Sequence, residues 1–472
     1  MTLTRRSSLA LATLALLAGA ALRIAFVRHA PPLTGDATIY GQIATNWMQS
    51  NFYGYSPGGH PHPTLIRLPG YPLFLMLCFR LFGIGNYTAV MAVQCIADLL
   101  TCVLVGLTAR RLFGRAAGLL ALTLAALCPF TSNYVATPLT ETLTLLTIAT
   151  VLYSLTRWLA RPGLSPWLFL LAIALAYSLL LRPEQALLTV AVIPVLWWRC
   201  GPVGWRPAAQ AVLSKLGPAA VATLCVLLPL VPWTARNWHT FHVFQPLAPH
   251  YATDPGEYVP LGFQRWFRSW AVDFASTEDV YWNFDGAEIK MGDLPNRAFD
   301  SPRQRAHTAA ILADYNQTTD NNPAINARFE DLARERIAHS PARYYLWLPF
   351  ARVANMLLRP RTELMQTTLD WWNRREYPHD FSFAFSYAAL NLAYLALGLA
   401  GALRWRRIVP RPRPMLLATV AFVLMRCALL LTLDNSEPRY TLELFPILCL
   451  WAGALAARRR FNVGQTSSSY PS

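Results

Sequence analysis

The chain has 472 residues, of which 54% are hydrophobic and only 14% are charged. Soluble domains usually carry about 25% charged residues, so this composition excludes an ordinary soluble protein and indicates a membrane protein. The net charge of +16 is compatible with nucleic-acid binding. However, many arginines stand at the ends of apolar blocks, which is typical of cytoplasmic membrane loops. We therefore expect membrane lipids, and no nucleic acid, among the partners.

Seven apolar blocks are near the ~20 residues that a helix needs to cross a bilayer. They cover residues 8–27, 88–109, 138–159, 217–233, 383–403, 415–433 and 441–457. Shorter runs at 116–130, 167–181 and 185–198 are weaker candidates. The sequence therefore predicts an all-α polytopic membrane protein with a bundle of about ten transmembrane helices, interfacial helices and an external segment.

The arginines predict the topology. Arg5 and Arg6 precede the first block and Arg110 follows the second, and basic boundaries of this kind stay in the cytoplasm. The first block therefore exits, 88–109 returns, and the short run at 69–83 between them is an interfacial helix on the outer face. The same reasoning predicts that the run at 344–358 does not cross the membrane and that both termini lie in the cytoplasm.

This topology divides the chain into four parts. Residues 1–233 form an N-terminal transmembrane module with a first external loop at 28–86, which is the expected catalytic loop. Residues 234–381 form an external segment with an interfacial helix, and 382–460 form C-terminal transmembrane helices. Residues 461–472 are expected to be a disordered tail. The eight cysteines include no CxxC pair, so neither a disulfide framework nor a zinc site of cysteines is expected.

Asp36 is the one acidic residue of the first external loop. It stands just before an amphipathic stretch in which Ile39, Ile43 and Trp47 share one helical face, and this stretch is expected to lie on the membrane. Aspartate is also favoured as a helix N-cap. A capping role and a chemical role are both open, and the two are compatible.

Further along the same loop, glycines and prolines surround His60, His62, Arg67 and Tyr71. Such residues fix a non-helical turn near the membrane surface. Arg67 is a candidate bidentate donor to a phosphate group, or else an interfacial arginine on lipid headgroups. The two histidines are candidate metal ligands, although a proline-rich loop can equally carry them without an ion.

Other charged residues stand at the outer ends of apolar blocks. Glu141 is a candidate because a carboxylate beside a span is costly, although a first-turn acid is also favoured by the helix dipole. Arg182 and Glu184 can simply pair with each other, and Arg439 can be an interfacial anchor. The full set is Glu141, Arg182, Glu184, Arg236, Glu437, Arg439 and Tyr440. By the arginine count all of them lie on one face of the membrane, which predicts a site there.

Five sequence pieces, in this order, resemble the GT-C superfamily of membrane glycosyltransferases. More narrowly, they are similar to bacterial relatives of the protein O-mannosyltransferases and of the lipid A aminoarabinose transferase (family 39-like). The pieces are Gly35-Asp36-Ala37-x-x-Tyr40, Arg67-x-Pro69-Gly70-Tyr71-Pro72, Thr140-Glu141-Thr142, Pro232-Trp233-Thr234-Ala235-Arg236-Asn237, and Glu437-Pro438-Arg439-Tyr440 with Pro446. The resemblance spans roughly residues 10–455.

The resemblance implies an inverting glycosyltransferase in the bacterial cytoplasmic (inner) membrane. Such an enzyme moves a sugar from a polyprenyl-phosphate carrier to a lipid, glycan or protein acceptor on the outer face. Asp36 matches the catalytic position of the family, and Glu141 is the next candidate. Phosphate contacts are expected from Arg67, Arg236 and Arg439, and substrate contacts from Tyr40, His60, His62, Tyr71, Arg182, Glu184, Glu437 and Tyr440.

The chain departs from the family in one respect. Many relatives have Asp-Glu at the catalytic motif, whereas here Ala37 follows Asp36. A two-carboxylate or metal-bridged arrangement is therefore in doubt; no cofactor is certain, and a divalent metal stays an option. The alternative function is a transporter or flippase of lipid-linked glycans. It would be expected to show paired repeats and mid-span charges, and neither is evident in the sequence.

Overall fold

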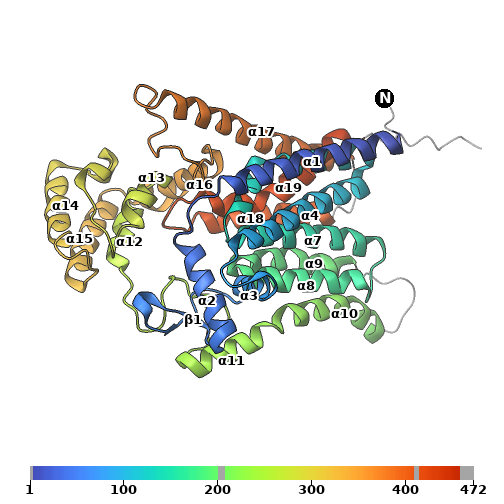
Figure 1. Cartoon of the computed structure of the whole chain (residues 1–472), viewed down its shortest axis with the longest axis horizontal. Coiled ribbons are helices and arrows are strands. Elements are labelled where there is room, and N and C mark those ends of the chain that lie inside the picture. The colour runs from blue at the N-terminus through green and yellow to red at the C-terminus, as the bar shows by residue number, and fades with distance from the viewer. Residues whose placement is uncertain (1–3, 200–207, 409–413, 458–472) are drawn as a thin grey trace, which may run out of the picture.

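The computed structural model describes residues 4–199, 208–408 and 414–457, which fold almost entirely as helices (Figure 1). Among them, the strands β1 (Gly54–Tyr55) and β2 (His62–Pro63) form a short antiparallel pair in the first loop. The all-α prediction is therefore confirmed for the described residues. The tail expected at 461–472 lies outside them.

In this described part, five helical segments are long and apolar enough to cross a membrane, so the chain is a multi-pass membrane protein. They are α1 (Arg5–Arg28), α4 (Tyr87–Phe113), α7 (Glu141–Ala160), the segment Gly217–Phe241 of α10 (Ala208–Leu227) and α11 (Leu230–Phe241), and α17 (Pro378–Ile408). A sixth span results if α5 (Arg115–Ala126) is joined to Pro129–Ala136, which includes α6 (Pro129–Asn133), across a bend of 44°. The predicted total of about ten crossings would require shorter apolar helices to cross the membrane as well.

The shorter apolar helices are α3 (Gly70–Phe82), α8 (Pro166–Leu181), α9 (Ala186–Arg199) and α18 (Pro414–Leu430). The span expected at 441–457 is not one regular helix. It consists of 3-10 turns at Pro438–Leu444 and Ala454–Ala456 on either side of α19 (Phe445–Gly453). Every residue of α19 is buried, and α19 packs against α4, α5 and α17. This segment therefore lies in the protein core of the bundle.

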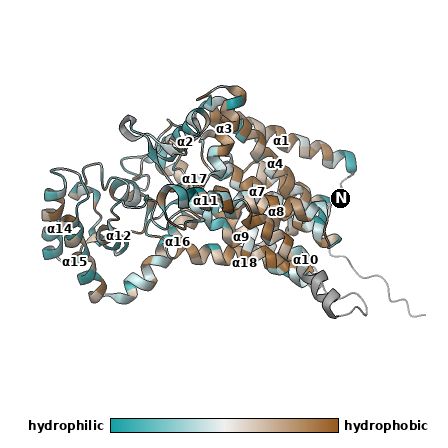
Figure 2. Ribbon diagram, turned by 90° about the horizontal axis from the view of Figure 1, so that it is seen from below, coloured by the Kyte–Doolittle hydropathy of each residue, from teal (hydrophilic) through white to brown (hydrophobic). Residues whose placement is uncertain are grey.

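The outside of the bundle is apolar. Large side chains such as Leu14, Leu17, Ile173 and Leu424 are each more than 60% exposed, and Figure 2 shows hydrophobic residues concentrated on the bundle helices. Soluble monomers rarely expose contiguous apolar surface on this scale. A surrounding bilayer accounts for this exposure, because lipid tails solvate leucine side chains without cost.

The segment after α11 contains a separately packed helical unit. Its elements are α12 (Leu261–Arg268), α13 (Phe274–Ser276), α14 (Pro302–Tyr315) and α15 (Pro323–His339). The next helix, α16 (Leu348–Leu358), packs instead against α17 and α18 of the bundle. Aromatic residues form the core of the unit, and the rings of Phe263 and Phe284 stack with centroids 3.7 Å apart. In Figure 1, α14 and α15 lie at the opposite end of the molecule from the N-terminus.

Helix α2 (Asp36–Ser50) differs from the prediction in its surroundings. The face formed by Ile39, Ile43 and Trp47 was expected on the membrane. Instead, it packs on a small apolar cluster that includes Tyr53 and Trp233, and Ile43 is completely buried. The prediction was wrong because the loop folds back over α2, and protein side chains can cover an apolar face as well as lipid can.

We predict that neither α3 nor α16 crosses the membrane, because a crossing would move the arginines after α4 or α17 to the outside. Single cysteines at Ile84 and Arg375, in a background without the eight native cysteines, test this. A membrane-impermeant maleimide should label both positions in intact cells. Labelling of either position only after the cells are broken would contradict the topology.

Candidate active site

The Asp36 carboxylate is held between two arginines that are remote in sequence. Its Oδ1 accepts a hydrogen bond from Nη2 of Arg67 at 2.5 Å, and its Oδ2 accepts one from Nη1 of Arg439 at 3.1 Å. The N-cap of α2 is Gly35, and the Asp36 side chain makes no capping bond. Asp36 therefore does not act as the N-cap of α2 in this structure. We call Asp36, Arg67 and Arg439 the carboxylate–arginine triad.

The fold brings the two arginines to Asp36 from opposite ends of the chain. Arg67 lies between β2 and α3, where its backbone carbonyl accepts a hydrogen bond from the hydroxyl of Tyr53 at 2.9 Å. Its guanidinium lies 5.8 Å from the ring centre of Tyr40. Arg439 lies in the 3-10 turns before α19 and pairs with Glu437 as well as with Asp36. The triad thus joins the first loop to the start of the last apolar segment.

The electrostatics keep Asp36 ionised. Burial alone would raise the pKa of this carboxyl, but the charges and hydrogen bonds of Arg67 and Arg439 outweigh burial and lower the pKa below its usual value. Burial has the larger effect at Glu437 and raises the pKa of that carboxyl, although Arg439 opposes it. The two acids that share Arg439 therefore shift in opposite directions, and Asp36 is the one that stays charged as the pH falls.

A second group of charges lies inside the bundle. Arg182 donates to Glu141 at 3.0 Å and to Glu184 at 2.7 Å. Arg426 lies 3.4 Å from Glu184 and 3.2 Å from Glu443, and Glu443 lies 3.5 Å from Arg182. The expected pair of Arg182 and Glu184 exists, but it is part of this larger network. Glu141 serves as a partner of Arg182, although its Oε2 has no hydrogen-bond partner among the described residues.

Arg426 and Glu443 were not predicted as site residues from the sequence. Both are almost completely buried, at 2% exposure each, and both lie within the apolar runs at 415–433 and 441–457. A charged residue inside an apolar run is costly unless it is paired, so its position was the available signal. Tyr440 lies between the two groups of charges, with its ring 5.9 Å from the guanidinium of Arg182 and 5.8 Å from that of Arg439.

Arg236 does not join the triad. Its guanidinium donates to the backbone carbonyls of Tyr53 at 2.6 Å and Thr64 at 2.8 Å. It also lies 5.1–5.4 Å from the ring centres of Tyr53, Trp233 and Phe241. These contacts fasten the first loop to α11, so Arg236 has a structural role here. Its expected contact with phosphate stays a prediction.

The remaining predicted substrate residues fall in different environments. Tyr71 is completely buried and donates its hydroxyl hydrogen to Gln94 at 2.7 Å, and its ring meets Tyr40 edge-on at 5.1 Å. His60 is exposed in the turn between β1 and β2. Tyr71 therefore packs against Tyr40, whose ring in turn lies against the guanidinium of Arg67.

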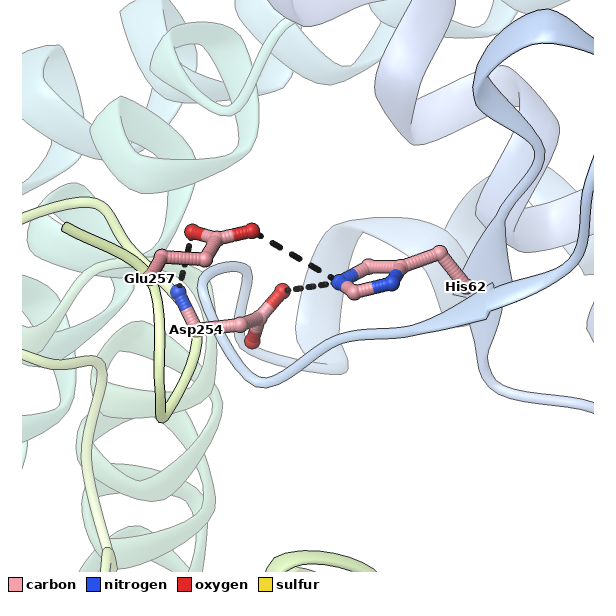
Figure 3. Close-up of side chains that lie close together, drawn as sticks. All are labelled: His62, Asp254 and Glu257. Carbon is pink, nitrogen blue, oxygen red and sulfur yellow. Dashed lines mark hydrogen bonds and ion pairs between the residues drawn. The ribbon is translucent and has the colours of Figure 1, made fainter. Parts of the chain in front are cut away.

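A metal ion does not fit at Asp36. Both carboxylate oxygens already accept hydrogen bonds from guanidinium groups, and a cation would be repelled by these two positive charges. A different group of described residues has suitable spacing for a metal ion, namely His62, Asp254 and Glu257 (Figure 3). His62 was predicted from the sequence as a candidate metal ligand. Its two acidic neighbours, which lie 192 and 195 residues further along the chain, were not.

A cavity of about 600 Å³ lies beside the packed unit after α11. Arg265, Arg268, Tyr344, Tyr345 and Asp434 are among the residues that line it. Arg268 and Asp434 form an ion pair at 3.3 Å across its wall. Because Asp434 stands five residues before Arg439, the cavity and the triad share one loop. No sequence motif marked this cavity.

Residues 60–233 match the family model described as dolichyl-phosphate-mannose-protein mannosyltransferase (PMT_2). No curated protein sequence matches the chain. Among solved structures, the chain resembles the oligosaccharyltransferase AglB of the archaeon Archaeoglobus fulgidus, bound to an inhibitory peptide and a dolichol-phosphate, with 11% identity and a TM-score of 0.50. That likeness covers 95% of this chain and 50% of AglB.

A second match is ArnT of Cupriavidus metallidurans bound to undecaprenyl phosphate, with 15% identity and a TM-score of 0.33 over 94% of this chain and 77% of ArnT. The chain thus spans about half the length of the archaeal enzyme that it matches. The AglB likeness shows a shared membrane fold over nearly the whole chain, as the GT-C resemblance implied. The match at residues 60–233 shows, in addition, that this part of the chain is similar to the PMT_2 family.

Proposed function

We propose that the protein is an inverting glycosyltransferase that moves a sugar from a polyprenyl-phosphate carrier to an acceptor on the outer face of the bacterial cytoplasmic membrane. The observation that carries the proposal is the carboxylate–arginine triad. It combines one ionised carboxylate with two guanidinium groups that come from segments 372 residues apart. Arg67 and Arg439 are each partly exposed, with about a fifth of the side chain accessible.

The proposed reaction needs these groups and few others. A phosphate is already a good leaving group, so no general acid is required. The reaction needs a base for the acceptor proton and fixed positive charge beside the departing phosphate. A hydrolase that works in two steps would instead use two carboxylates about 5–5.5 Å apart. Asp36 as the base and the two arginines as the phosphate site meet the needs of the transferase reaction, not those of such a hydrolase.

The arginines can bind both Asp36 and a phosphate. A guanidinium carries five N–H donors in a planar fork that fits carboxylate and phosphate groups. Arg67 uses one nitrogen on Asp36 and another weakly, at 3.4 Å, on its own loop, while its Nε has no partner among the described residues. An arriving phosphate can therefore draw donors away from the carboxylate. Asp36 would then be free to accept a proton when the donor substrate is bound.

In the proposed step, the acceptor oxygen or nitrogen attacks the anomeric carbon from the side opposite the phosphate. A new bond to that carbon forms while its bond to the phosphate oxygen breaks, and the configuration inverts. The acceptor proton passes to Asp36, and the electron pair of the broken bond leaves with the phosphate. Arg67 and Arg439, oriented by their contacts with the bound donor phosphate, stabilise the negative charge that develops there.

We propose that the acceptor approaches through the cavity beside α12 and α15. Its lining combines arginine and tyrosine side chains, which suit polar or anionic groups of a lipid, glycan or protein. The loop from Asp434 to Arg439 joins the wall of this cavity to the triad, which supports this route for the acceptor. The identity of the sugar depends on contacts beyond the triad.

The first test is the substitution Asp36→Asn, which keeps the size of the side chain but removes the basic carboxylate. We expect turnover to fall by roughly 10²–10⁴-fold, the usual contribution of a general base. Mass spectrometry of surface glycans and glycoproteins from a gene-deletion strain first identifies the missing product. Complementation with wild-type and variant genes, followed by assays of the purified proteins, then measures the transfer.

Asp331→Asn is the matched control. Asp331 lies on α15 and its side chain is 70% exposed, so its replacement should leave transfer unchanged. Size-exclusion chromatography and donor binding should show that the Asp36→Asn variant is folded. Transfer at the wild-type rate by this folded variant would contradict the proposed mechanism.

The second test uses pH. Arg67→Gln removes one of the two charges that lower the pKa of Asp36, so this pKa should rise. The base is then protonated at a higher pH than in the wild type, and the acid limb of the kcat/KM profile should move to higher pH. Arg80→Gln, on the exposed side of α3, is the control and should leave the limb in place. An unmoved limb in the Arg67→Gln variant would show that Asp36 is not the group that titrates.

A further inference from the structure

Three side chains with metal-ligating atoms meet where the first loop touches the segment after α11 (Figure 3). His62 comes from β2, whereas Asp254 and Glu257 come from a turn between α11 and α12. The Nε2 atom of His62 lies 3.4 Å from Oδ2 of Asp254 and 3.6 Å from Oε1 of Glu257. All three candidate ligand atoms lie within 4.8 Å of one another.

These separations suit a shared metal ion better than direct hydrogen bonds. A charged N–H···O hydrogen bond is usually about 2.7–2.9 Å long, and both contacts of His62 exceed that range. Ligand atoms that lie about 2.0–2.1 Å from a tetrahedral zinc ion are roughly 3.3–3.4 Å apart. The two measured distances are close to that value, so a small adjustment of rotamers would bring the three atoms around one ion.

Each of the two carboxylates is held by a hydrogen bond from a backbone N–H to one of its oxygens. Oδ1 of Asp254 accepts the backbone N–H of Leu65 at 2.7 Å, and Oε2 of Glu257 accepts the backbone N–H of Asp254 at 2.7 Å. The ring of His62 meets that of Tyr55 edge-on at 5.5 Å. One oxygen of each carboxylate is therefore engaged, while the other points toward Nε2 of His62. Such outer contacts are typical of metal ligands.

The buried atoms that face this point lack partners. Asp254 is 96% buried, as its relative exposure is 4%. Its Oδ2 atom has no hydrogen-bond partner among the described residues, and neither has Nε2 of His62. A buried polar atom without a partner destabilises the folded state, and more so when it is charged. A cation at this point would satisfy both atoms together.

We propose that His62, Asp254 and Glu257 bind one divalent transition-metal ion, with zinc as the best fit. One imidazole nitrogen and two carboxylate oxygens suit zinc and its neighbours rather than magnesium or calcium, which prefer ligand sets made of oxygen. Three protein ligands leave a fourth position for water. This inference concerns a site away from Asp36 and does not depend on the proposed transfer reaction.

The metal would clamp the first loop to the segment after α11. Residues 62–65 are already tied there, because Leu65 donates to Asp254 and Thr64 accepts from Arg236. Arg67 follows two residues later. A bound ion would stabilise the folded state by mass action, since His62 is separated from the two acids by more than 190 residues and the three ligands do not meet in the unfolded chain.

Zinc binding to the purified full-length protein tests the proposal. The protein is treated with a chelator, exchanged into metal-free detergent buffer, titrated with zinc and analysed by elemental mass spectrometry after removal of free ion. We expect one zinc per wild-type chain. The site variants H62Q, D254N and E257Q should each lose this zinc, whereas the neighbouring control H60Q should retain it because His60 is exposed and outside the group.

Thermal unfolding provides a readout that does not rely on activity. Added zinc should raise the Tm of the wild type and of H60Q, and this shift should disappear in the site variants. E257Q is the decisive variant, because the Glu257 side chain is 40% exposed and its change should not prevent folding even if D254N does. A wild-type chain without zinc, or an E257Q chain that binds zinc like the wild type, would show that the three residues form only an ion pair.

Discussion

The charge of Asp36 is the constraint on which the candidate site depends. A partly buried carboxylate needs positive partners, and they come from Arg67 in the first loop and Arg439 before the last apolar segment. The ends of the bundle helices must therefore meet at one point for the charge to be tolerated. In the proposed function, the same partners that make the carboxylate acceptable in the free protein also bind the phosphate of the donor. Stability and function thus place the same demand on this part of the fold.

The second group of charges, which lies inside the bundle, also needs oppositely charged partners. Arg182 and Arg426 are surrounded by Glu141, Glu184 and Glu443, all within a low-dielectric bundle. Removing one partner from such a buried group typically costs about 3–5 kcal/mol, because a charge is left without compensation. The helices that carry these residues are therefore fixed relative to one another. Since Tyr440 lies near both Arg182 and Arg439, this rigidity extends to the triad. Arginines that do not move cost no reorganisation when charge develops on a leaving group.

The sequence predicted the parts of this arrangement that depend on local pattern. Apolar length identified the long helices, and an acid in a loop beside arginines at span ends pointed to Asp36, Arg67 and Arg439. Contacts between distant segments were harder to predict. Arg236 fits the same pattern at a span end, yet backbone carbonyls of the folded loop take its donors. Asp254 and Glu257 gain significance only because β2 brings His62 to them. The apolar face of α2 predicted burial correctly but not its partner, because lipid and protein cover leucine and isoleucine equally well.

The first loop is held from two directions, and the order of its contacts along the chain has a consequence. At one end, Arg236 and Asp254 bind the backbone at Thr64 and Leu65; at the other, Tyr53 binds the carbonyl of Arg67. Besides the ion pair of Arg67 with Asp36, an apolar cluster of Ile43, Leu65 and Leu68 joins this stretch to α2, the helix that carries Asp36. The short stretch of backbone that follows Thr64 therefore connects the segment after α11 directly to Arg67. That segment also contributes Arg268 to the cavity wall, so the proposed catalytic loop is tied to the segment that forms the cavity as well as to the membrane helices.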